Sequence, residues 1–505
     1  MPLFNNDDLD LIEQKGLTPE EVANQIDIFK KGNQYVRLES AATLNKGILK
    51  LSSEEQQTLK QKYDLAVDNL KVAKFTPASG MATRMFKFLY FFQKEFDPNK
   101  ESLNAYLNKK KTHKLREFIA GIEIFPFFKE IDDELQKKEI RKTPLNKYRI
   151  AFINLVLERF GGIPKGLVPF HNYQGEVVTA FEEQIHESLH YIKSRQSIKQ
   201  HFTIPPENAT MIKEFMEPIV SKISKQHNVA IEIEYSHQHS KTDTLAVDEN
   251  NNPVRNDQDQ LVFRNGGHGS LLHNLNELDE DIVFIKNIDN VSKKDWHEKR
   301  SLHKKILAGK LLSVQEECFE WLRKIDDKSA NRKELEIFIK EELNLSHLLE
   351  SSDQQFFEAC KKALHRPIRV CGMVKNEGEP GGGPFWVNKK GINFLQIVES
   401  AQVDIKNKKQ KNIFKSGSHF NPVDLVCGLK DYTGQKFDLT QFSDPNAYFI
   451  SNKSMRGTPV KALEHPGLWN GSMSLWTTIF VEVPIFTFTP VKSSNELLRP
   501  GHQVY

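Results

Sequence analysis

Three short segments of this sequence carry residue types that suit phosphate and metal chemistry. The first, residues 77–85, reads Pro-Ala-Ser-Gly-Met-Ala-Thr-Arg-Met and follows a short apolar run. The second, residues 164–169, holds Lys165 between a proline and a glycine. The third, residues 282–290, is an apolar run that leads to Asp289, with asparagines nearby on both sides. Small residues, fixed cations and a carboxylate at a strand end are the groups that a polyphosphate and its magnesium ion need.

The first segment suits a triphosphate. Its small side chains let backbone amides approach phosphate closely, and a helix that begins at Thr83 adds the positive end of its dipole. Arg84 supplies charge-assisted hydrogen bonds to phosphate oxygens. The glycine spacing fits neither a Walker loop nor the dinucleotide fingerprint. An ordinary strand-to-helix turn explains this segment equally well when it is taken alone.

Lys165 and Asp289 complete a candidate phosphate and metal site. A lysine in a rigid loop serves as a point charge on phosphate, although a surface turn is an equal alternative. Asp289 follows an apolar strand, and ligands of open α/β sheets bind beyond the carboxyl ends of the strands. A carboxylate there can hold Mg²⁺ against phosphates. We favour this interpretation of Asp289 over a simple Asn/Asp turn.

A different motif, HExxH, points to zinc chemistry. It places His186 and His190 one helical turn apart, as in zinc proteases. Such a site needs a third ligand, for which Glu214 is the candidate. The helix also has an apolar stripe that explains it without a metal, so a zinc hydrolase is the least favoured alternative.

Composition and charge set the broad class. The 505 residues allow two or more lobes, and a hydrophobic fraction of 38% is enough for a core. A net charge of +3 gives no reason to expect nucleic acid or a membrane surface as a partner. The four cysteines form no CxxC pair. No apolar run approaches the roughly 20 residues of a membrane span, and the acidic start lacks a signal-peptide pattern, so we expect a cytoplasmic protein.

Strands that alternate with helices predict an α/β protein with a mainly parallel sheet, followed by a smaller β-rich half. We expect five regions, which are an N-terminal helical region at 1–70, a nucleotide-binding core at 71–295 with a helical insertion at about 95–160, a second helical insertion at 296–365, a sugar-binding half at 366–490 and a tail at 491–505.

The three segments, together with others downstream, resemble the motifs of nucleotide-sugar pyrophosphorylases of the UDP-sugar type. The further matches are residues 236–244, 267–269, 371–374, 397–399, 418–421 and 459–461. The family's order is kept throughout. Ala82 departs from a usual glycine, and the first loop has one glycine where the family has three. The whole chain also resembles a bacterial family of about this length whose function is unknown.

This resemblance implies a Rossmann-like fold of the glycosyltransferase-A type and a set of site residues. Arg84, Lys165 and Asp289 would act in catalysis, with Asp289 holding Mg²⁺. The implied nucleotide-binding residues are Ser79, Gly80, Met81, Ala82, Thr83, Ser236, Gln238, Gly267, His268 and Gly269. The implied sugar-phosphate-binding residues are Gly372, Glu399, Asn421 and Lys461.

The sequence therefore predicts an enzyme that joins a sugar 1-phosphate to a nucleoside triphosphate, with UTP favoured, and releases pyrophosphate. Two alternatives share the fold: a catalytically silent nucleotide-sugar binding protein and a glycosyltransferase. The sugar, the base and the oligomeric state are left open by the sequence.

Overall fold

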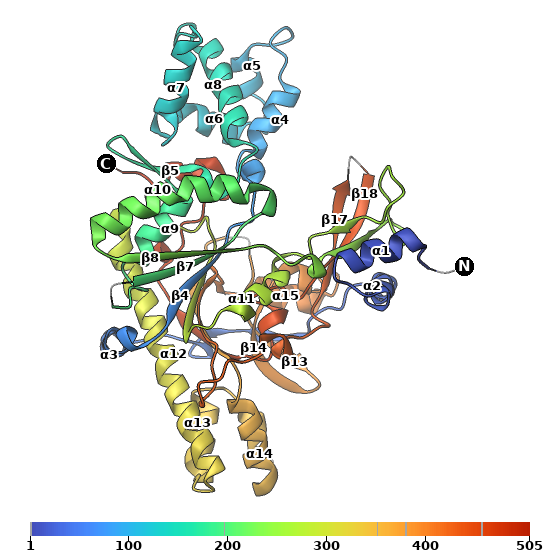
Figure 1. The fold of residues 1–505 in the computed structure, drawn as a ribbon, viewed down its shortest axis with the longest axis vertical. Helices are drawn as coiled ribbons and strands as arrows, with labels where there is room; N and C mark the ends of the chain where they lie inside the picture. The colour runs from blue at the N-terminus through green and yellow to red at the C-terminus, as the bar shows by residue number, and fades with distance from the viewer. Residues whose placement is uncertain (1–2, 196, 351, 379–380, 456–457, 505) are drawn as a thin grey trace. The chain divides into compact units, whose positions relative to one another are not determined.

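The computed structural model describes residues 3–195, 197–350, 352–378, 381–455 and 458–504 and shows a mixed α/β protein with several sheets (Figure 1). The chain divides into two compact units. Unit 1 comprises Met1–Phe75, Ser236–Ile285 and Lys304–Ile485, and unit 2 comprises Thr76–Tyr235, Lys286–His303 and Phe486–Tyr505. Each unit combines segments from more than one of the five ranges expected from the sequence.

Unit 1 holds most of the strands. Its helices are α1 (Asn6–Gln14), α2 (Pro19–Lys31), α3 (Ser53–Ala66), α11 (Leu272–Glu277), most of α12 (His297–Asp326), α13 (Arg332–Glu341), α14 (Asp353–Leu364) and α15 (Lys408–Lys415). Its strands are β1 (Leu38–Ala41), β2 (Thr43–Leu44), β3 (Gly47–Leu49), β9 (Thr244–Val247), β10 (Phe263–Arg264), β11 (Ile282–Lys286), β12 (Ile368–Lys375), β13 (Gly383–Lys389), β14 (Ile392–Val398), β15 (His419–Phe420), β16 (Asp424–Gly428), β17 (Phe449–Met455), β18 (Thr458–Glu464), β19 (Thr477–Glu482) and the start of β4 (Val72–Pro77).

The large sheet of unit 1 follows the order β2-β3-β19-β12-β16-β11-β4. The pairs β2/β3, β3/β19, β12/β19 and β4/β11 are parallel, and β12/β16 is antiparallel. Two smaller antiparallel sheets have the orders β10-β9-β18-β17 and β1-β13-β14. The expected parallel pairing is therefore present, but it is interrupted at β16.

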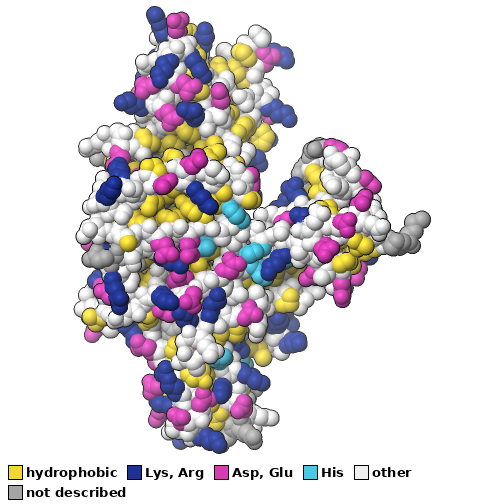
Figure 2. All heavy atoms as spheres, viewed as in Figure 1, with side chains coloured by type: hydrophobic (Ala, Val, Ile, Leu, Met, Phe, Trp, Pro, Cys, Tyr) yellow, Lys and Arg dark blue, Asp and Glu magenta, His cyan; other side chains and the backbone are white. Residues whose placement is uncertain are grey.

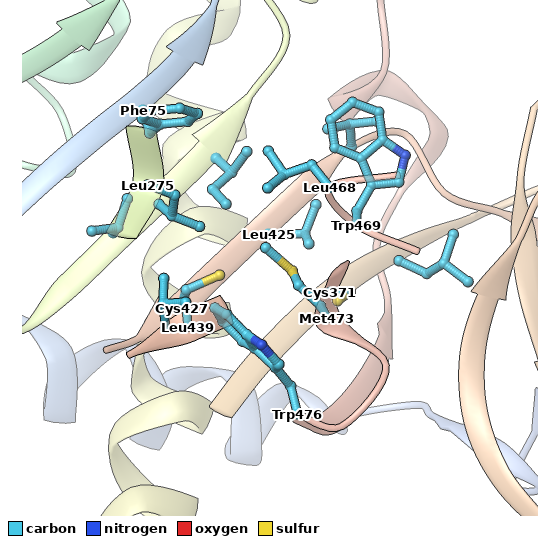
Figure 3. Packing of buried hydrophobic residues seen from close by; sticks show 14 of the residues in the cluster. Phe75, Leu275, Cys371, Leu425, Cys427, Leu439, Leu468, Trp469, Met473 and Trp476 are labelled. Atoms are coloured by element: carbon cyan, nitrogen blue, oxygen red, sulfur yellow. The ribbon is translucent and has the colours of Figure 1, made fainter. Parts of the chain in front are cut away.

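The core of unit 1 is built on this sheet. Strand β11 is buried at all five positions, which matches its uninterrupted apolar sequence. Side chains from Phe75, Leu275, Cys371, Leu425 and Trp476 converge in one hydrophobic cluster (Figure 3). Strands β1 to β3 lie within residues 1–70, which the sequence pattern had predicted as helical only.

Unit 2 is richer in helices. They are α4 (Lys87–Glu95), α5 (Leu103–Leu107), α6 (His113–Ala120), α7 (Phe128–Lys137), α8 (Leu145–Phe160), α9 (Ala180–Ser188) and α10 (Ala209–His227). Its strands are β5 (Pro169–Tyr173), β6 (Glu176–Thr179), β7 (Ser197–Thr203) and β8 (Ala230–Ser236). The end of β4 lies beside β7, since Thr203 accepts a hydrogen bond from the Ala78 amide at 2.8 Å.

The surface carries both signs of charge. Lysine and arginine side chains are interspersed with aspartate and glutamate on the face that Figure 2 shows. Within the described residues, no helix has the length and apolar character needed to cross a membrane.

Candidate functional site

The first two candidate segments are joined to each other in unit 2. The Lys165 amide donates to the Gly80 carbonyl at 3.0 Å, and the Ala82 amide donates to Ile163 at 3.0 Å. An antiparallel bridge between Met81 and residue 164 lies between these two bonds. The backbone of one segment therefore fixes the backbone of the other, although about eighty residues separate them.

The first loop ends in a tight turn. The helix expected to begin at Thr83 is replaced by a 3₁₀ turn over Ala82–Arg84, and α4 begins only at Lys87. Ser79, Gly80, Thr83 and Arg84 are exposed. Arg84 makes no ion pair within the described part of the chain, so its guanidinium is available to an anion.

The third segment meets the second through an ion pair. Lys165 Nζ lies 2.6 Å from Asp289 Oδ2, and the two side chains are only 13% and 18% exposed. The Asp289 carbonyl accepts a hydrogen bond from the Val491 amide at 3.1 Å, which anchors the loop after β11. All three candidate phosphate and metal segments are thus in contact.

The neighbouring asparagine has a structural role. Asn290 is 1% exposed, and its Oδ1 accepts hydrogen bonds from Arg300 Nη2 at 2.9 Å and the Thr489 amide at 3.0 Å. Its oxygen is therefore not available to a metal, and Asp289 supplies the carboxylate of this loop. Among the described residues, no group of three His, Cys, Asp or Glu side chains could hold a metal ion. One carboxylate fits Mg²⁺ that takes its other ligands from phosphate and water.

Beneath this loop lies a buried charge network that the sequence analysis missed. Glu183 Oε1 accepts hydrogen bonds from His171 Nδ1 and the Tyr173 hydroxyl, both at 2.7 Å. His297 Nε2 lies 3.2 Å from Glu183 Oε2. His171 Nε2 is 2.9 Å from His502 Nδ1. These residues come from four distant segments, and no local spacing marks them as partners.

The hydrogen-bond partners in the network indicate which ring nitrogens of its histidines carry protons. His502 Nε2 faces the Thr489 carbonyl at 3.1 Å, so it must donate, and burial keeps the pKa of His502 well below its usual value. In neutral His502 the Nδ1 atom then accepts, which requires a proton on His171 Nε2. The Nδ1 of His171 donates to the carboxylate. Both ring nitrogens of His171 therefore act as hydrogen-bond donors in this arrangement. Burial alone would raise the pKa of Glu183, but His171 and His297 hold it below its ordinary value.

The HExxH motif is accounted for by packing. Helix α9 ends at Ser188, so His190 lies beyond it. The glutamate of the motif, Glu187, forms a buried ion pair with Lys286 on β11. His186 is buried, with Nε2 4.0 Å from Glu182 Oε1. Neither histidine contacts the third ligand suggested by the sequence, Glu214, among the contacts of the described chain.

His186 gives a testable pH dependence. Burial lowers its pKa from 6.5 to about 4. As the pH falls, the unfolded chain takes up this proton first, so the stabilising contribution is complete above about 6.5 and is lost toward pH 4. We expect His186→Gln to flatten the fall in unfolding free energy between pH 6.5 and 4 by up to about 3 kcal/mol, measured by denaturant titration at several pH values. An unchanged pH profile would contradict this assignment. Nucleotide binding by this variant should equal that of the parent.

In unit 1, His268 stacks on Trp469 beside Glu399. The ring centroids are 4.3 Å apart with an interplanar angle of 20°. Trp469 Nε1 donates to Glu399 Oε1 at 3.3 Å, and His268 Nε2 lies 3.8 Å from the same oxygen. Two candidates from separate motifs are therefore adjacent. Trp469 belongs to the hydrophobic cluster of unit 1, and its indole also orients the Glu399 carboxylate.

The glycines around His268 are required by close packing. Gly267 has φ +79°, and a Cβ on Gly269 would lie 2.2 Å from the Pro466 carbonyl oxygen. Ser236 and Gln238 each make a hydrogen bond to another side chain of unit 1. Ser236 Oγ accepts from Asn274 Nδ2 at 2.9 Å, and Gln238 Nε2 donates to a threonine hydroxyl at 3.1 Å.

The other sugar candidates fall into two groups. The Asn421 amide donates to Gly382 at 2.8 Å, and a Cβ on Gly382 would be 2.9 Å from Glu399 Cγ, so Asn421 lies close to Glu399. Gly372 lies within β12, where a side chain would press on the core. Lys461 instead lies on β18, where its ammonium donates to the Glu249 carbonyl at 2.7 Å and to an asparagine at 2.9 Å. No contact in the described chain joins Lys461 to Glu399 or Asn421.

A family profile matches residues 5–503, almost the whole chain. The chain belongs to the DUF4301 family. The description of this family is a domain of unknown function. No curated protein matches the DUF4301 chain.

Several solved structures are similar to this DUF4301 chain. The uridine diphosphate N-acetylglucosamine pyrophosphorylase from Trypanosoma brucei, in complex with an inhibitor, is 12% identical over 91% of this chain and 72% of that chain, with a TM-score of 0.48. A UDP-glucose phosphorylase from Trypanosoma brucei is 13% identical over 97% and 77%, with a TM-score of 0.46. A UDP-glucose pyrophosphorylase mutant from Leishmania major, in complex with UDP-glucose, is 11% identical over 97% and 77%, with a TM-score of 0.44. Likenesses this weak leave the activity of the DUF4301 chain to be argued from its own residues.

Proposed function

We propose that this DUF4301 chain is a cytoplasmic nucleotidyltransferase that joins a sugar 1-phosphate to a nucleoside triphosphate, with UTP favoured, and releases pyrophosphate. The observation that carries the proposal is the contact of three separate segments around the Lys165–Asp289 pair. They bring an exposed loop of small residues, two cations and one carboxylate into a single part of unit 2. These are the groups that a triphosphate and Mg²⁺ require.

The reaction needs no covalent enzyme intermediate. An oxygen of the sugar phosphate attacks the α-phosphorus of the triphosphate, and the bond from that phosphorus to the leaving pyrophosphate breaks. The chain's task is then to position both substrates and to neutralise developing negative charge.

In unit 2 we assign the triphosphate to residues 79–83, of which Ser79, Gly80 and Thr83 are exposed, whereas the Ala82 amide already donates to Ile163. Arg84 and Lys165 would neutralise the leaving pyrophosphate. Asp289 would hold Mg²⁺, which supplies further charge neutralisation when it is bound. The Lys165–Asp289 pair keeps both groups compensated until their partners bind, since each is mostly buried.

In unit 1 we assign Gly267, His268, Gly269, Ser236 and Gln238 to the base and ribose. Gly267 packs against Glu464 and Gly269 against Pro466, which fixes the backbone on both sides of His268. For the sugar we assign Glu399, Asn421 and Gly372, with Glu399 accepting hydrogen bonds from hydroxyl groups. Lys461 remains the candidate for the sugar phosphate.

A catalytically silent nucleotide-sugar binding protein is the second candidate. Two of the charged groups assigned above already have partners within the protein, which favours this candidate. Asp289 forms an ion pair with Lys165, and the Lys461 ammonium donates to the Glu249 carbonyl. Such a protein would bind nucleotide without turnover, whereas a glycosyltransferase of this fold would release a nucleoside diphosphate instead of pyrophosphate.

Binding selectivity tests the phosphate assignment. We expect Arg84→Ala and Lys165→Ala each to weaken UTP binding by about 1.5–3 kcal/mol and to change UMP binding much less, because each loses a charge-assisted contact to the terminal phosphates. The double variant should depart from additivity, and added salt should weaken the parent more than the double variant. Titration calorimetry checks this, with exposed Lys94→Ala on α4 as the control. Parent-like UTP binding by both single variants would contradict the assignment.

A further inference from the structure

Unit 1 contains a cavity whose lining includes none of the residues assigned above. Its volume is about 470 Å³, within the range of small-molecule sites. We call it the insertion pocket, because one wall is formed by residues 343–348 and by helix α14 of the second helical insertion. The opposite wall comes from β13, β14 and residues 474–478. The apolar part of this lining includes Leu345, Leu348, Phe394, Leu395, Leu475 and Trp476.

The charges of the insertion pocket have one sign. Lys362, Arg366, Lys389 and Lys390 line it, and none of its described lining residues is Asp or Glu. The chain as a whole has 70 lysines and arginines and 67 acidic residues, so a lining that holds only positive charges differs from the balanced composition of the chain. Lys389 has a partner, since its Nζ lies 2.6 Å from Asp444. The pocket therefore presents a cationic rim to whatever enters it.

Arg366 has the strongest need for an anion. Its side chain is half-buried in the lining, and this burial lowers the pKa of the guanidinium. Its Nε donates to the Lys362 carbonyl at 3.1 Å, and no carboxylate pairs with it within the described chain. His347 also lines the pocket. Burial lowers the pKa of this histidine, and the positive charge of Arg366 lowers it further. Arg366 is half-buried, so a ligand that brings an anionic group to it would compensate a charge that is only partly solvated.

Two neutral polar groups of the same lining also lack partners. Trp476 is 4% exposed, and its Nε1 has no hydrogen-bond acceptor among the described residues. The Ser474 hydroxyl is likewise buried without a partner there. An indole N–H can only donate, so the site calls for an acceptor oxygen. Figure 3 shows the Trp476 indole among the apolar side chains of the unit 1 core.

We propose that the insertion pocket binds an amphiphilic anion, with an apolar body against the leucine and aromatic side chains and an acidic head group at Arg366. The head group is a carboxylate, sulfonate or phosphate monoester, all of which offer acceptor oxygens to the guanidinium. This site is separate from the proposed nucleotidyltransferase residues and does not depend on that function. The ligand can be a free acid or the head and upper chain of a membrane lipid, since both present the same chemistry.

Decanoate is a suitable probe below its micelle concentration. Titration calorimetry on the full chain should give about one site per chain for decanoate, with no detectable binding of 1-decanol or decylamine at the same concentrations. Arg366→Gln should weaken decanoate binding by about 10- to 100-fold, because one charge-assisted contact is lost. Lys340→Gln, an exposed lysine of α13 in the same insertion, should bind decanoate like the parent.

A second variant tests the cavity itself. Ala359 lines the pocket from α14 and is half-buried, so Ala359→Phe should fill the space and abolish decanoate binding while the unfolding temperature stays near that of the parent. Flotation with vesicles that contain phosphatidic acid, a lipid whose head group is a phosphate monoester, separates the two sources of ligand. If the parent floats with the vesicles and Arg366→Gln does not, the ligand is a lipid head group. If the parent binds decanoate but does not float, the ligand is a free acid. Equal binding of decanoate and 1-decanol, unchanged binding in Arg366→Gln, or no binding of decanoate would overturn the proposal.

Discussion

Asp289→Asn should abolish turnover of UTP and sugar 1-phosphate while the fold survives. The variant keeps the shape of the side chain but removes the carboxylate that would hold Mg²⁺. Loss of one of few charged ligands removes several kcal/mol of transition-state stabilisation, which corresponds to a rate reduction of at least about a hundredfold. Pyrophosphate release measured at saturating magnesium checks this result.

The same substitution separates binding from catalysis. Asp289 Oδ2 lies 2.6 Å from Lys165 Nζ, so the variant frees the ammonium. Without magnesium, UTP should therefore bind the variant at least as tightly as it binds the parent. Asp295→Asn is the matched control, because Asp295 is exposed and lies six residues further along in the same unit. Near-normal turnover in Asp289→Asn would remove the basis of the metal assignment.

Glu183→Gln should destabilise the protein by about 3–5 kcal/mol. The side chain is fully buried, and the substitution removes the carboxylate that accepts hydrogen bonds from His171 and the Tyr173 hydroxyl. Removing one partner of a buried ion pair carries a cost of this size. Denaturant titration at neutral pH measures the change in unfolding free energy.

The buried network also connects to the candidate site. The C-terminal segment contains both His502, which contacts His171, and Val491, whose amide donates to the Asp289 carbonyl. Glu183→Gln should therefore also weaken turnover at temperatures below its unfolding. Glu217→Gln, on the exposed face of α10, should change stability by no more than about 0.5 kcal/mol. A loss no larger than in this control would show that the network does not carry the charges assigned to it.

Local patterns in the sequence predicted local structure well. The spacing of Thr18 and Glu21 is that of a capping box, and this box is present at the start of α2. Strand β11 is buried, as its apolar run indicates. Helices α12 to α14 lie within residues 296–365, where the sequence predicts helix. These features depend on residues within one or two turns of each other, so a single sequence contains the information.

Features that depend on distant contacts were not predictable in the same way. Glu183 and His502 belong to segments that are far apart, and nothing in either segment signals the other. At Ala82–Arg84 a 3₁₀ turn takes the place of the expected helix start, and the Ala82 amide there donates to the distant Ile163, a contact that no local pattern signals. The insertion pocket depends on how α14 packs near β13 and β14, which no periodicity specifies.

Sugar-dependent pyrophosphate release is the most direct test of the proposed activity. Purified parent protein is incubated with UTP, Mg²⁺ and a panel of sugar 1-phosphates, and both pyrophosphate and the nucleotide product are measured. The proposal predicts that at least one sugar 1-phosphate yields pyrophosphate and a UDP-sugar in equal amounts, and that Asp289→Asn yields neither. Tight UTP binding with no pyrophosphate for any sugar or nucleoside triphosphate tested would contradict it and would favour a silent binding protein.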